Sequence, residues 1–504
     1  MALRRLTVAL SAAAAMITLA IPASALAATG AGGATGQLRS AIPTAASAPA
    51  ASAPAGYVPS SHTTRPAFSA KKASCHRVSS APAGTERCTQ MQRLPLKDLS
   101  AAQWAQRQDM ASSHAKPIAP RAGAAAQATL VPPSQCNFSG FEYALTGVSH
   151  PDRFTSCADT LWVASNWEVT STPPFVILQG IFFWEDQQWT SYSATSGSWT
   201  HGMLAMGYTD GAAGNLSDGI SGTVYSGCFL AEGICTETSL TTPDPQQVSL
   251  APGEVLPFGW DETDTGPSSA GPGGLNTLDP YLGVTWEIEN TAQPTQALDV
   301  GNLAGRCDSQ ATSTDGCVDE AFIPTLSLSL ARYGSSAAMI QWAQFNLSGA
   351  WGLQGVGAPL HRLTDSILSN NNREVICDSS FVANPAITAA LAPYGDTDSC
   401  DEYPFASSYE SGAMVDGVTG SPKPYVTTGA NCAQVTAVQT GTSGTHEAAD
   451  WNSITVSGTP SGTEPCVRGH IPGLLNSLVG SAYSALITTN RLISKDPFWV
   501  AVTA

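Results

Sequence analysis

The sequence predicts a multidomain protein in which an all-β, sandwich-like domain precedes an α+β domain. Between residues 136 and 300, short β-branched and aromatic runs such as residues 175–184 alternate with Gly, Ser, Asn and Asp. This texture is typical of an antiparallel β protein. From residue 306 to 504, apolar residues recur at helical spacing. A chain of 504 residues is long enough for two or three such domains, each with its own core.

The first 28 residues have the composition of a secretory signal peptide. Arg4 and Arg5 precede an apolar run over residues 8–21, and small residues follow at the spacing that a signal peptidase requires. No later segment reaches the roughly 18 uninterrupted apolar residues of a membrane span. We therefore expect a secreted, extracellular protein with no membrane partner.

Residues 29–135 form an Ala-, Pro- and Ser-rich leader. Because it offers few large apolar side chains for burial, we expect it to be largely disordered. One short helix is expected near residues 99–107, with Ser100 as its N-cap.

Regular elements are predicted again in the C-terminal domain. Residues 335–347 and 471–483 carry apolar side chains three and four positions apart, which indicates helices. Residues 496–502 begin with Asp-Pro and continue as an apolar and aromatic run, which favours a closing strand.

The cysteines form an even set, and in an exported chain such a set predicts disulfides rather than a metal site. No Cys-x-x-Cys occurs. We interpret them as six pairs of sequence neighbours, although sequence alone does not fix the connectivity. The twelve residues are Cys75, Cys88, Cys136, Cys157, Cys228, Cys235, Cys307, Cys317, Cys377, Cys400, Cys432 and Cys466.

The charge balance argues against general affinity for polyanions. The chain has 22 Lys and Arg against 39 Asp and Glu, a formal net charge of -17. Proteins that bind nucleic acid tightly neutralise phosphates with Lys and Arg. A hydrolase needs only a local cationic cluster, and a bound cation adds positive charge.

Residues 400–412 carry the most informative pattern. Asp401 and Glu402 are adjacent, and Glu410 supplies a third acid nine positions after the first. Hydrolysis of a phosphodiester needs a base and a divalent cation, and oxygen ligands suit Mg²⁺ or Mn²⁺. These three acids with the amide oxygen of Asn476 would be a sufficient set.

This pattern resembles the signature of the NucA/NucB family of secreted and DNA-entry deoxyribonucleases, which reads Asp-Glu-aromatic-Pro with a Glu-Gly-Gly-like turn downstream. The similarity continues in residues 357–377, 476–480 and 490–498, and covers about residues 306–504. It implies a ββα-metal-like nuclease domain, one Mg²⁺ or Mn²⁺, and nonspecific endonucleolytic cleavage of DNA. We expect the protein to be a monomer.

The resemblance also implies roles for individual residues. Asp401 would be the general base, and Glu402 and Glu410 would hold the water or the metal. Asn476 would lie near the metal at a helix start. The substrate-binding side chains would be Arg362, Arg373 and His361, and the implied disulfide joins Cys377 to Cys400.

Three positions depart from the family pattern. Leu475 stands where the family often has an acidic or polar residue, Val479 where it has glutamine, and Ser411 where it has the first glycine. The departures support an alternative from another class. In that alternative the chain is an exported, disulfide-stabilised binding or surface-interaction protein with an inactive nuclease-like domain.

Other patterns carry less specific signals. The Trp and Tyr side chains of the β domain could line a carbohydrate-binding face, and the acidic segment 261–264 could bind calcium or be a solvated loop. His446 and Glu447 are similar to the start of the zinc-peptidase motif His-Glu-x-x-His, but Asp450 replaces its second histidine.

Overall fold

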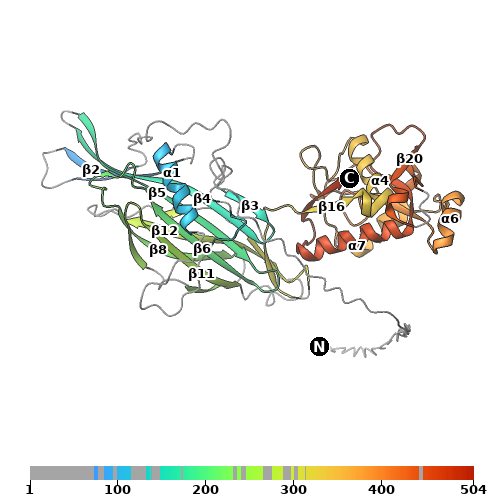
Figure 1. Cartoon of the computed structure of the whole chain (residues 1–504), viewed down its shortest axis with the longest axis horizontal. Coiled ribbons are helices and arrows are strands. Elements are labelled where there is room, and N and C mark those ends of the chain that lie inside the picture. Colours follow the sequence, from blue (N-terminus) through green and yellow to red (C-terminus); the bar gives the residue numbers. More distant parts are fainter. Residues whose placement is uncertain are drawn as a thin grey trace, which may run out of the picture. The chain divides into compact units, whose positions relative to one another are not determined.

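A computed structural model describes residues 73–77, 84–94, 99–114, 132–136, 138, 148–171, 174–230, 235–239, 246–264, 275–287, 297–299, 305–312, 314–441 and 446–504 (Figure 1). The predicted signal peptide, residues 1–28, lies outside these residues. The described chain is a mixed α+β protein that consists mostly of strands.

The N-terminal region contains two antiparallel sheets. In the described part of the chain, one has nine strands in the order β1-β2-β4-β5-β6-β11-β9, with β3 paired to β4 and β7 paired to β5. Its strands are β1 (Ser74–Arg77), β2 (Thr85–Leu94), β3 (Val148–Asp152), β4 (Thr155–Ser171), β5 (Pro174–Tyr192), β6 (Ser198–Gly207), β7 (Ala213–Gly214), β9 (Cys235–Ser239) and β11 (Val255–Asp264).

The second sheet has six strands among the described residues, in the order β10-β8-β12-β14-β15, with β13 beside β12. They are β8 (Ile220–Leu230), β10 (Gln246–Leu250), β12 (Leu275–Glu287), β13 (Ala297–Asp299), β14 (Gly305–Asp308) and β15 (Gly316–Asp319). Ile220 and Leu250 from this sheet share one hydrophobic cluster with Trp162, Trp184 and Trp260 from the first sheet. Burial of these large apolar side chains holds the two sheets together.

Part of the predicted leader, residues 29–135, forms regular structure. β2 pairs with β4 over ten residues, from Thr85 opposite Thr170 to Leu94 opposite Leu161. Helix α1 (Ala101–His114) also belongs to this region, because its Trp104 lies in a buried cluster with residues of β4 and β5. The sequence of β2 is mostly polar, and only its register with β4 shows which of its residues are buried.

The predicted cap of this helix is confirmed. The Ser100 hydroxyl accepts a hydrogen bond from the backbone N–H of Gln103 at 3.1 Å, which satisfies one of the unpaired donors at the helix start.

A buried ionic cluster fixes α1 on the first sheet. The Nε of Arg107 donates to Glu185 at 2.9 Å, and its Nη2 donates to Asp159. Tyr208 donates its hydroxyl proton to the same glutamate. The side chains of the arginine and both acids have no exposed surface. Burial raises the pKa of Asp159 well above its usual range, and the nearby Glu185 adds to this effect, whereas the charge of Arg107 opposes it.

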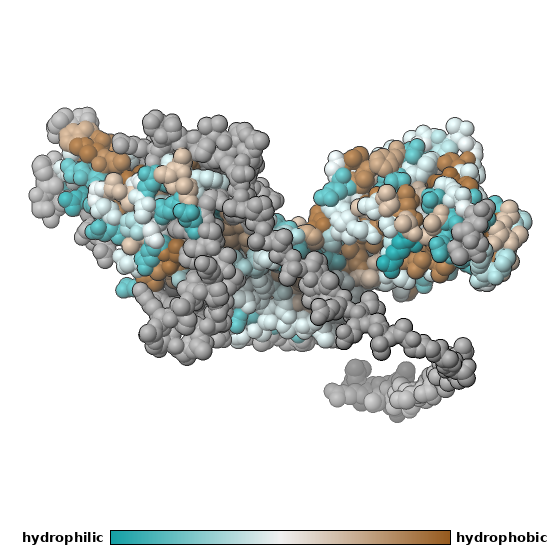
Figure 2. Space-filling model, viewed as in Figure 1, coloured by the Kyte–Doolittle hydropathy of each residue, from teal (hydrophilic) through white to brown (hydrophobic). Residues whose placement is uncertain are grey.

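The first sheet ends in an exposed apolar hairpin. Phe175, Val176 and Ile177 follow the turn between β4 and β5, and each is 40–46% exposed. Side chains alternate along a strand, so both faces of this hairpin end are apolar. Figure 2 shows apolar surface at this end of the molecule.

The C-terminal region contains two small mixed sheets. In the first, β22 (Pro497–Thr503) lies between β16 (Thr325–Ser329), to which it is parallel, and β17 (Leu360–His361). The second has the order β18-β21-β19-β20, in which only β19 and β21 are parallel. Its strands are β18 (Asp398–Tyr403), β19 (Ala433–Val438), β20 (Ser453–Ser457) and β21 (Val467–Pro472).

Four helices and three short 3₁₀ turns complete the described C-terminal region. They are α4 (Leu330–Asn346), α5 (Ser366–Ile376), α6 (Pro385–Leu391), η2 (Ala392–Tyr394), η3 (Gly429–Asn431), η4 (Ala448–Trp451) and α7 (Gly473–Thr489). The helices predicted over residues 335–347 and 471–483 correspond to α4 and α7, and the predicted closing strand corresponds to β22.

Helices α4 and α7 pack against the four-stranded sheet through one core. Met339 of α4, Leu475 of α7 and Ile471 of β21 belong to the same buried cluster. Gly469 of β21 permits a close approach, because a Cβ atom there would lie 2.6 Å from the sulfur of Met339. Helix α4 therefore packs closely against one face of β18 and β21.

Five disulfides join sequence neighbours, as predicted. They are Cys75–Cys88, Cys136–Cys157, Cys307–Cys317, Cys377–Cys400 and Cys432–Cys466. The side chains of Cys228 and Cys235, the sixth predicted pair, lie outside the described residues. Such a number of disulfides is typical of proteins from an oxidising compartment. Among the described helices, none has the length and apolar character that crossing a membrane requires.

Candidate functional site

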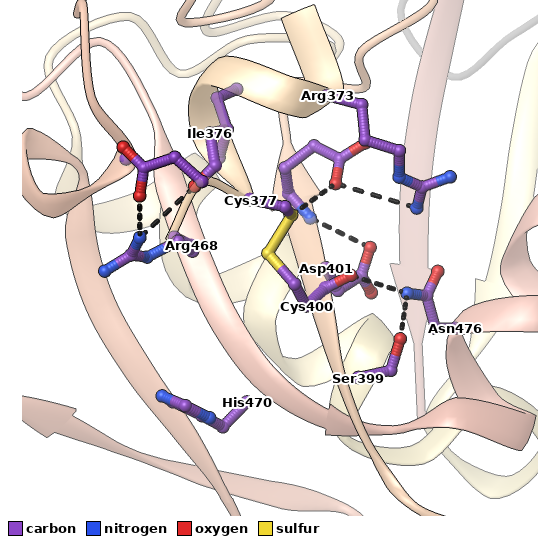
Figure 3. The surroundings of a disulfide bond; sticks show 12 residues. Arg373, Ile376, Cys377, Ser399, Cys400, Asp401, Arg468, His470 and Asn476 are labelled. Atoms are coloured by element: carbon purple, nitrogen blue, oxygen red, sulfur yellow. Dashed lines mark hydrogen bonds and ion pairs between the residues drawn. A yellow bond between two sulfur atoms is a disulfide. The ribbon is translucent and has the colours of Figure 1, made fainter. Parts of the chain in front are cut away.

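Strand β18, strand β21 and helix α7 form one compact unit around the predicted site (Figure 3). The two strands are antiparallel, with Asp401 opposite Gly469, and β21 leads directly into α7. Asn476 lies in the first turn of α7. Its Nδ2 donates to the carbonyl oxygen of Cys400 at 2.9 Å and to the hydroxyl of Ser399 at 3.1 Å. The first turn of α7 is therefore hydrogen-bonded to β18 through the side chain of Asn476.

Asp401 lies on the same side of β18 as this amide. Alternate residues of a strand share a face, so Asp401 and Ser399 point to one side, and Asn476 contacts Ser399. Ser336 of α4 donates its hydroxyl proton to Asp401 Oδ2 at 3.0 Å, and the backbone N–H of Glu402 donates to Oδ1 at 2.9 Å. Asp401 is only 6% exposed.

This burial sets the proton affinity of Asp401. Burial raises the pKa of its carboxyl to about 6, although the hydrogen bonds from Ser336 and from the Glu402 backbone favour the charged form. At neutral pH the group is therefore mostly ionised but can take up a proton readily, which is the property required of a general base.

Glu402 points to the opposite face of β18. Its Oε2 lies 3.7 Å from Nη2 of Arg373 on α5, and the residue is 5% exposed. Burial raises the pKa of Glu402 to about 7, against the attraction of Arg373, and the charge of Asp401 raises it further. The side chain of Arg373 is 54% exposed, so this pair connects a buried acid to a cation at the surface.

Glu410 forms a separate pair with His361 of β17. One carboxylate oxygen accepts the backbone N–H of His361 at 2.8 Å, and the other lies 2.8 Å from its ring Nδ1. The neighbouring Arg362 is partly buried, and this burial lowers the pKa of its guanidinium. Glu410 thus anchors the loop after β18 to β17.

The three predicted acids do not form one cation-sized cluster. Among the described residues, the one group of three His, Cys, Asp or Glu ligand atoms within 4.8 Å of one another belongs to Cys75, Glu86 and Cys88. Two of these are joined in a disulfide, so they offer no thiolate to a metal. The structure brings Asp401 and Asn476 together, and it places Glu402 and Glu410 elsewhere.

A smaller set of oxygen donors remains at the α7 side of β18. Because Nδ2 of Asn476 is used by the strand, its Oδ1 is left for another partner. The hydroxyls of Ser399 and Ser336 lie beside the carboxylate and the amide. Mg²⁺ is commonly bound through one or two carboxylates while it keeps several waters. A Mg²⁺ or Mn²⁺ ion bound on this side would therefore have Asp401 as its one protein carboxylate.

Two contacts near the site were not predicted from the sequence: the one from Ser336, and those of His470, which was noted only as part of a pattern similar to the Arg-Gly-His of other nonspecific nucleases. Ser336 is distant in sequence and sits in an apolar helix pattern, so nothing in the sequence linked it to Asp401. His470, the partner of Cys400 across β18 and β21, lies 2.7 Å from Asp398 and stacks on Phe381 with ring centroids 4.2 Å apart. The alternation of β18 could have shown that Asp401 and Glu402 face opposite sides.

The two helix positions that depart from the family pattern have a structural role. Leu475 and Val479 are 2% and 3% exposed and belong to the main C-terminal core. At these positions α7 therefore contributes packing instead of metal ligands.

The chain matches no family model, no curated protein and no solved structure. Its functional assignment therefore depends on the residues and geometry described above.

Proposed function

We propose that the C-terminal region, from β16 to residue 504, forms a secreted, divalent-metal-dependent deoxyribonuclease domain of the ββα-metal type, similar to the NucA/NucB family. One observation carries this proposal. β18, β21 and α7 place a buried carboxylate of raised pKa, Asp401, on the same face as the helix amide Asn476. A base and a metal-holding amide on such a unit are the minimum that phosphodiester hydrolysis requires.

In this proposal Asp401 accepts the proton of the attacking water. Its ionised form predominates above pH 6, and Ser336 holds one of its oxygens in place. Asn476 Oδ1 and Asp401 would hold the cation, which supplies stabilisation of the charge that develops on the phosphoryl oxygens. Met339 and Leu475 belong to the hydrophobic core that packs beside this face.

Arg373 is the main side chain proposed to bind the substrate. Its guanidinium is half exposed and is tied to Glu402 on the strand that carries Asp401. We propose that it contacts a DNA phosphate, with weaker contributions from Arg362 and His361. With so few cations, binding should be weak and easily displaced by salt.

A second candidate is a binding protein with an inactive nuclease-like domain. Its specific support is the burial of Leu475 and Val479, together with the separation of Glu402 and Glu410 from Asp401. The N-terminal sheets, which we propose form a sandwich, would then provide the binding function, with carbohydrate as one possible partner class.

Plasmid nicking separates the two candidates. We expect the secreted protein to convert supercoiled plasmid to nicked and linear forms with Mg²⁺ or Mn²⁺, and EDTA to abolish this because the cation stabilises the transition state. Asp416→Asn, which replaces an exposed acid, serves as the matched control for site variants. Absence of cleavage with either metal at low salt would support the binding protein.

A further inference from the structure

We infer that the Cys377–Cys400 disulfide is a redox gate on the site, so that the domain cleaves DNA only after this bond has formed. This inference rests on the proposed nuclease function. It follows from where the two cysteines lie, since each is the neighbour of a different part of the site (Figure 3).

On the strand side, Cys400 is part of the site itself. It directly precedes Asp401, and its carbonyl oxygen accepts the hydrogen bond from Asn476 at 2.9 Å. Any shift of the backbone at Cys400 therefore moves the base and the helix amide relative to each other. Displacements of about 1 Å in a catalytic geometry cost about 100-fold in rate.

On the helix side, Cys377 ends α5. Its backbone N–H donates to the carbonyl oxygen of Arg373 at 2.7 Å, and its sulfur lies 3.6 Å from Glu402 Oε2. Arg373 lies one turn earlier and forms the ion pair with Glu402. The disulfide therefore connects the helix that carries the cation to the strand that carries both acids.

Apart from the disulfide, α5 has few buried contacts. Its buried residues are Asn372 and Ile376, whereas Ile367 is 71% and Leu368 is 39% exposed. Ile376 packs with Val426, Cys432 and Cys466. Asn372 Nδ2 donates to the carbonyl oxygen of Ala406 at 2.9 Å, and Arg468 Nη1 donates to the carbonyl oxygen of Ile376 at 3.3 Å.

The ion pair between Glu402 and the half-exposed Arg373 is long, at 3.7 Å, and contributes little by itself. Without the disulfide, α5 keeps its contacts to β21 and to the loop after β18 but loses its covalent link to β18. We therefore expect the end of α5 and the β18 backbone at Cys400 to shift relative to each other.

The Cys377–Cys400 disulfide is also more accessible to solvent than the Cys432–Cys466 disulfide. Cys377 and Cys400 are both partly exposed, whereas Cys432 and Cys466 are 4% and 0% exposed. A reductant in solution therefore reaches Cys377–Cys400 first, because thiol–disulfide exchange requires access to a sulfur.

The chemistry is a two-electron exchange with an external dithiol. A thiolate of the dithiol attacks one sulfur, the Cys377–Cys400 bond breaks, and a mixed disulfide forms while the released cysteine takes up a proton. The second thiol of the reductant then displaces the remaining cysteine, which leaves two protein thiols and one oxidised reductant. In a reducing compartment the site stays open and inactive, and export into an oxidising compartment closes it.

The test treats the oxidised full-length protein with graded dithiothreitol and follows three quantities together. Alkylation and mass spectrometry report which disulfides are open, plasmid nicking reports activity, and hydrogen exchange reports order in residues 366–376 and 398–403. We expect nicking to fall about 100-fold as Cys377–Cys400 opens and Cys432–Cys466 stays closed. Exchange in both segments should rise at the same step, and reoxidation should restore both readouts.

Paired variants extend the test. The double variant Cys377→Ser with Cys400→Ser should be inactive with or without reductant, whereas Cys75→Ser with Cys88→Ser, which removes a bond in β1 and β2, should keep its activity. Unchanged nicking and exchange after Cys377–Cys400 has opened would overturn the gate. If the oxidised protein cleaves no DNA at all, the proposed function fails, and the exchange measurement still decides whether the bond controls α5 and β18.

Discussion

Replacing Asp401 with asparagine is expected to abolish DNA cleavage and to make the protein more stable at neutral pH. Loss of a general base lowers a hydrolytic rate by about 10²- to 10⁴-fold. The variant keeps the shape of the side chain, and its amide can still accept from the Glu402 N–H and donate to Ser336, so the fold should be unaffected.

The gain in stability follows from the raised pKa of Asp401. Its carboxyl has a pKa of about 6 in the folded protein against an ordinary value of 3.8, so between these values the folded state binds the proton more tightly. Stability contributed by this group is therefore present below about pH 4 and is lost as the pH rises through 6. At pH 8 the parent protein has lost roughly 3 kcal/mol of this stability. The Asp401→Asn variant does not lose it, because asparagine carries no charge.

Calorimetry at pH 4 and pH 8, with plasmid nicking on the same samples, checks this prediction. The melting temperatures of Asp401→Asn and the parent should agree at pH 4 and differ by several degrees at pH 8, in favour of the variant. Asp416→Asn replaces an exposed acid and should change neither readout. Retained cleavage, or equal melting temperatures at both pH values, would rule out Asp401 as a buried base.

The second large effect is expected in the N-terminal region, at Arg107. Arg107→Met removes the positive charge beside Glu185 and Asp159 and leaves both buried acids without their cationic partner. Breaking a buried ionic cluster in this way costs about 3–5 kcal/mol. Because α1 is fixed on the sheet by this cluster, we expect it to detach in the variant.

Denaturant unfolding followed by tryptophan fluorescence reports this change, since Trp104 lies on the same helix. Arg93→Met, on the exposed side of β2, is the matched control and should stay within about 0.5 kcal/mol of the parent. If Arg107→Met unfolds at the same denaturant concentration as Arg93→Met, the cluster does not hold α1.

Local signals in the sequence predicted several elements correctly. α4, α7 and β22 follow from apolar spacing, and the cap at Ser100 follows from the preference for serine at a helix start. The five described disulfides join neighbours because short connections bring them together. In contrast, β2 was assigned to the leader, since its burial depends on pairing with β4, which lies about 75 residues away in sequence.

The residues of the candidate site divide in the same way, into those that the sequence predicted and those whose place depends on packing. The sequence identified Asp401 and Asn476, and the structure places them on one face. It could not identify Ser336, because that contact depends on how α4 packs on β18. Glu402 and Glu410 were grouped with Asp401 because the family pattern treats them as a set. Strand alternation and the pairing with His361 separate them in space.

The position of a bound cation tests the central claim most directly. Crystals of the oxidised protein soaked with Mn²⁺ should show an anomalous peak within about 2.3 Å of an Asp401 oxygen and of Asn476 Oδ1, since oxygen ligands lie at such distances from small divalent ions. A peak beside Glu410 and His361 instead, or no peak near β18 in crystals of protein that cleaves DNA with Mn²⁺, would contradict the account.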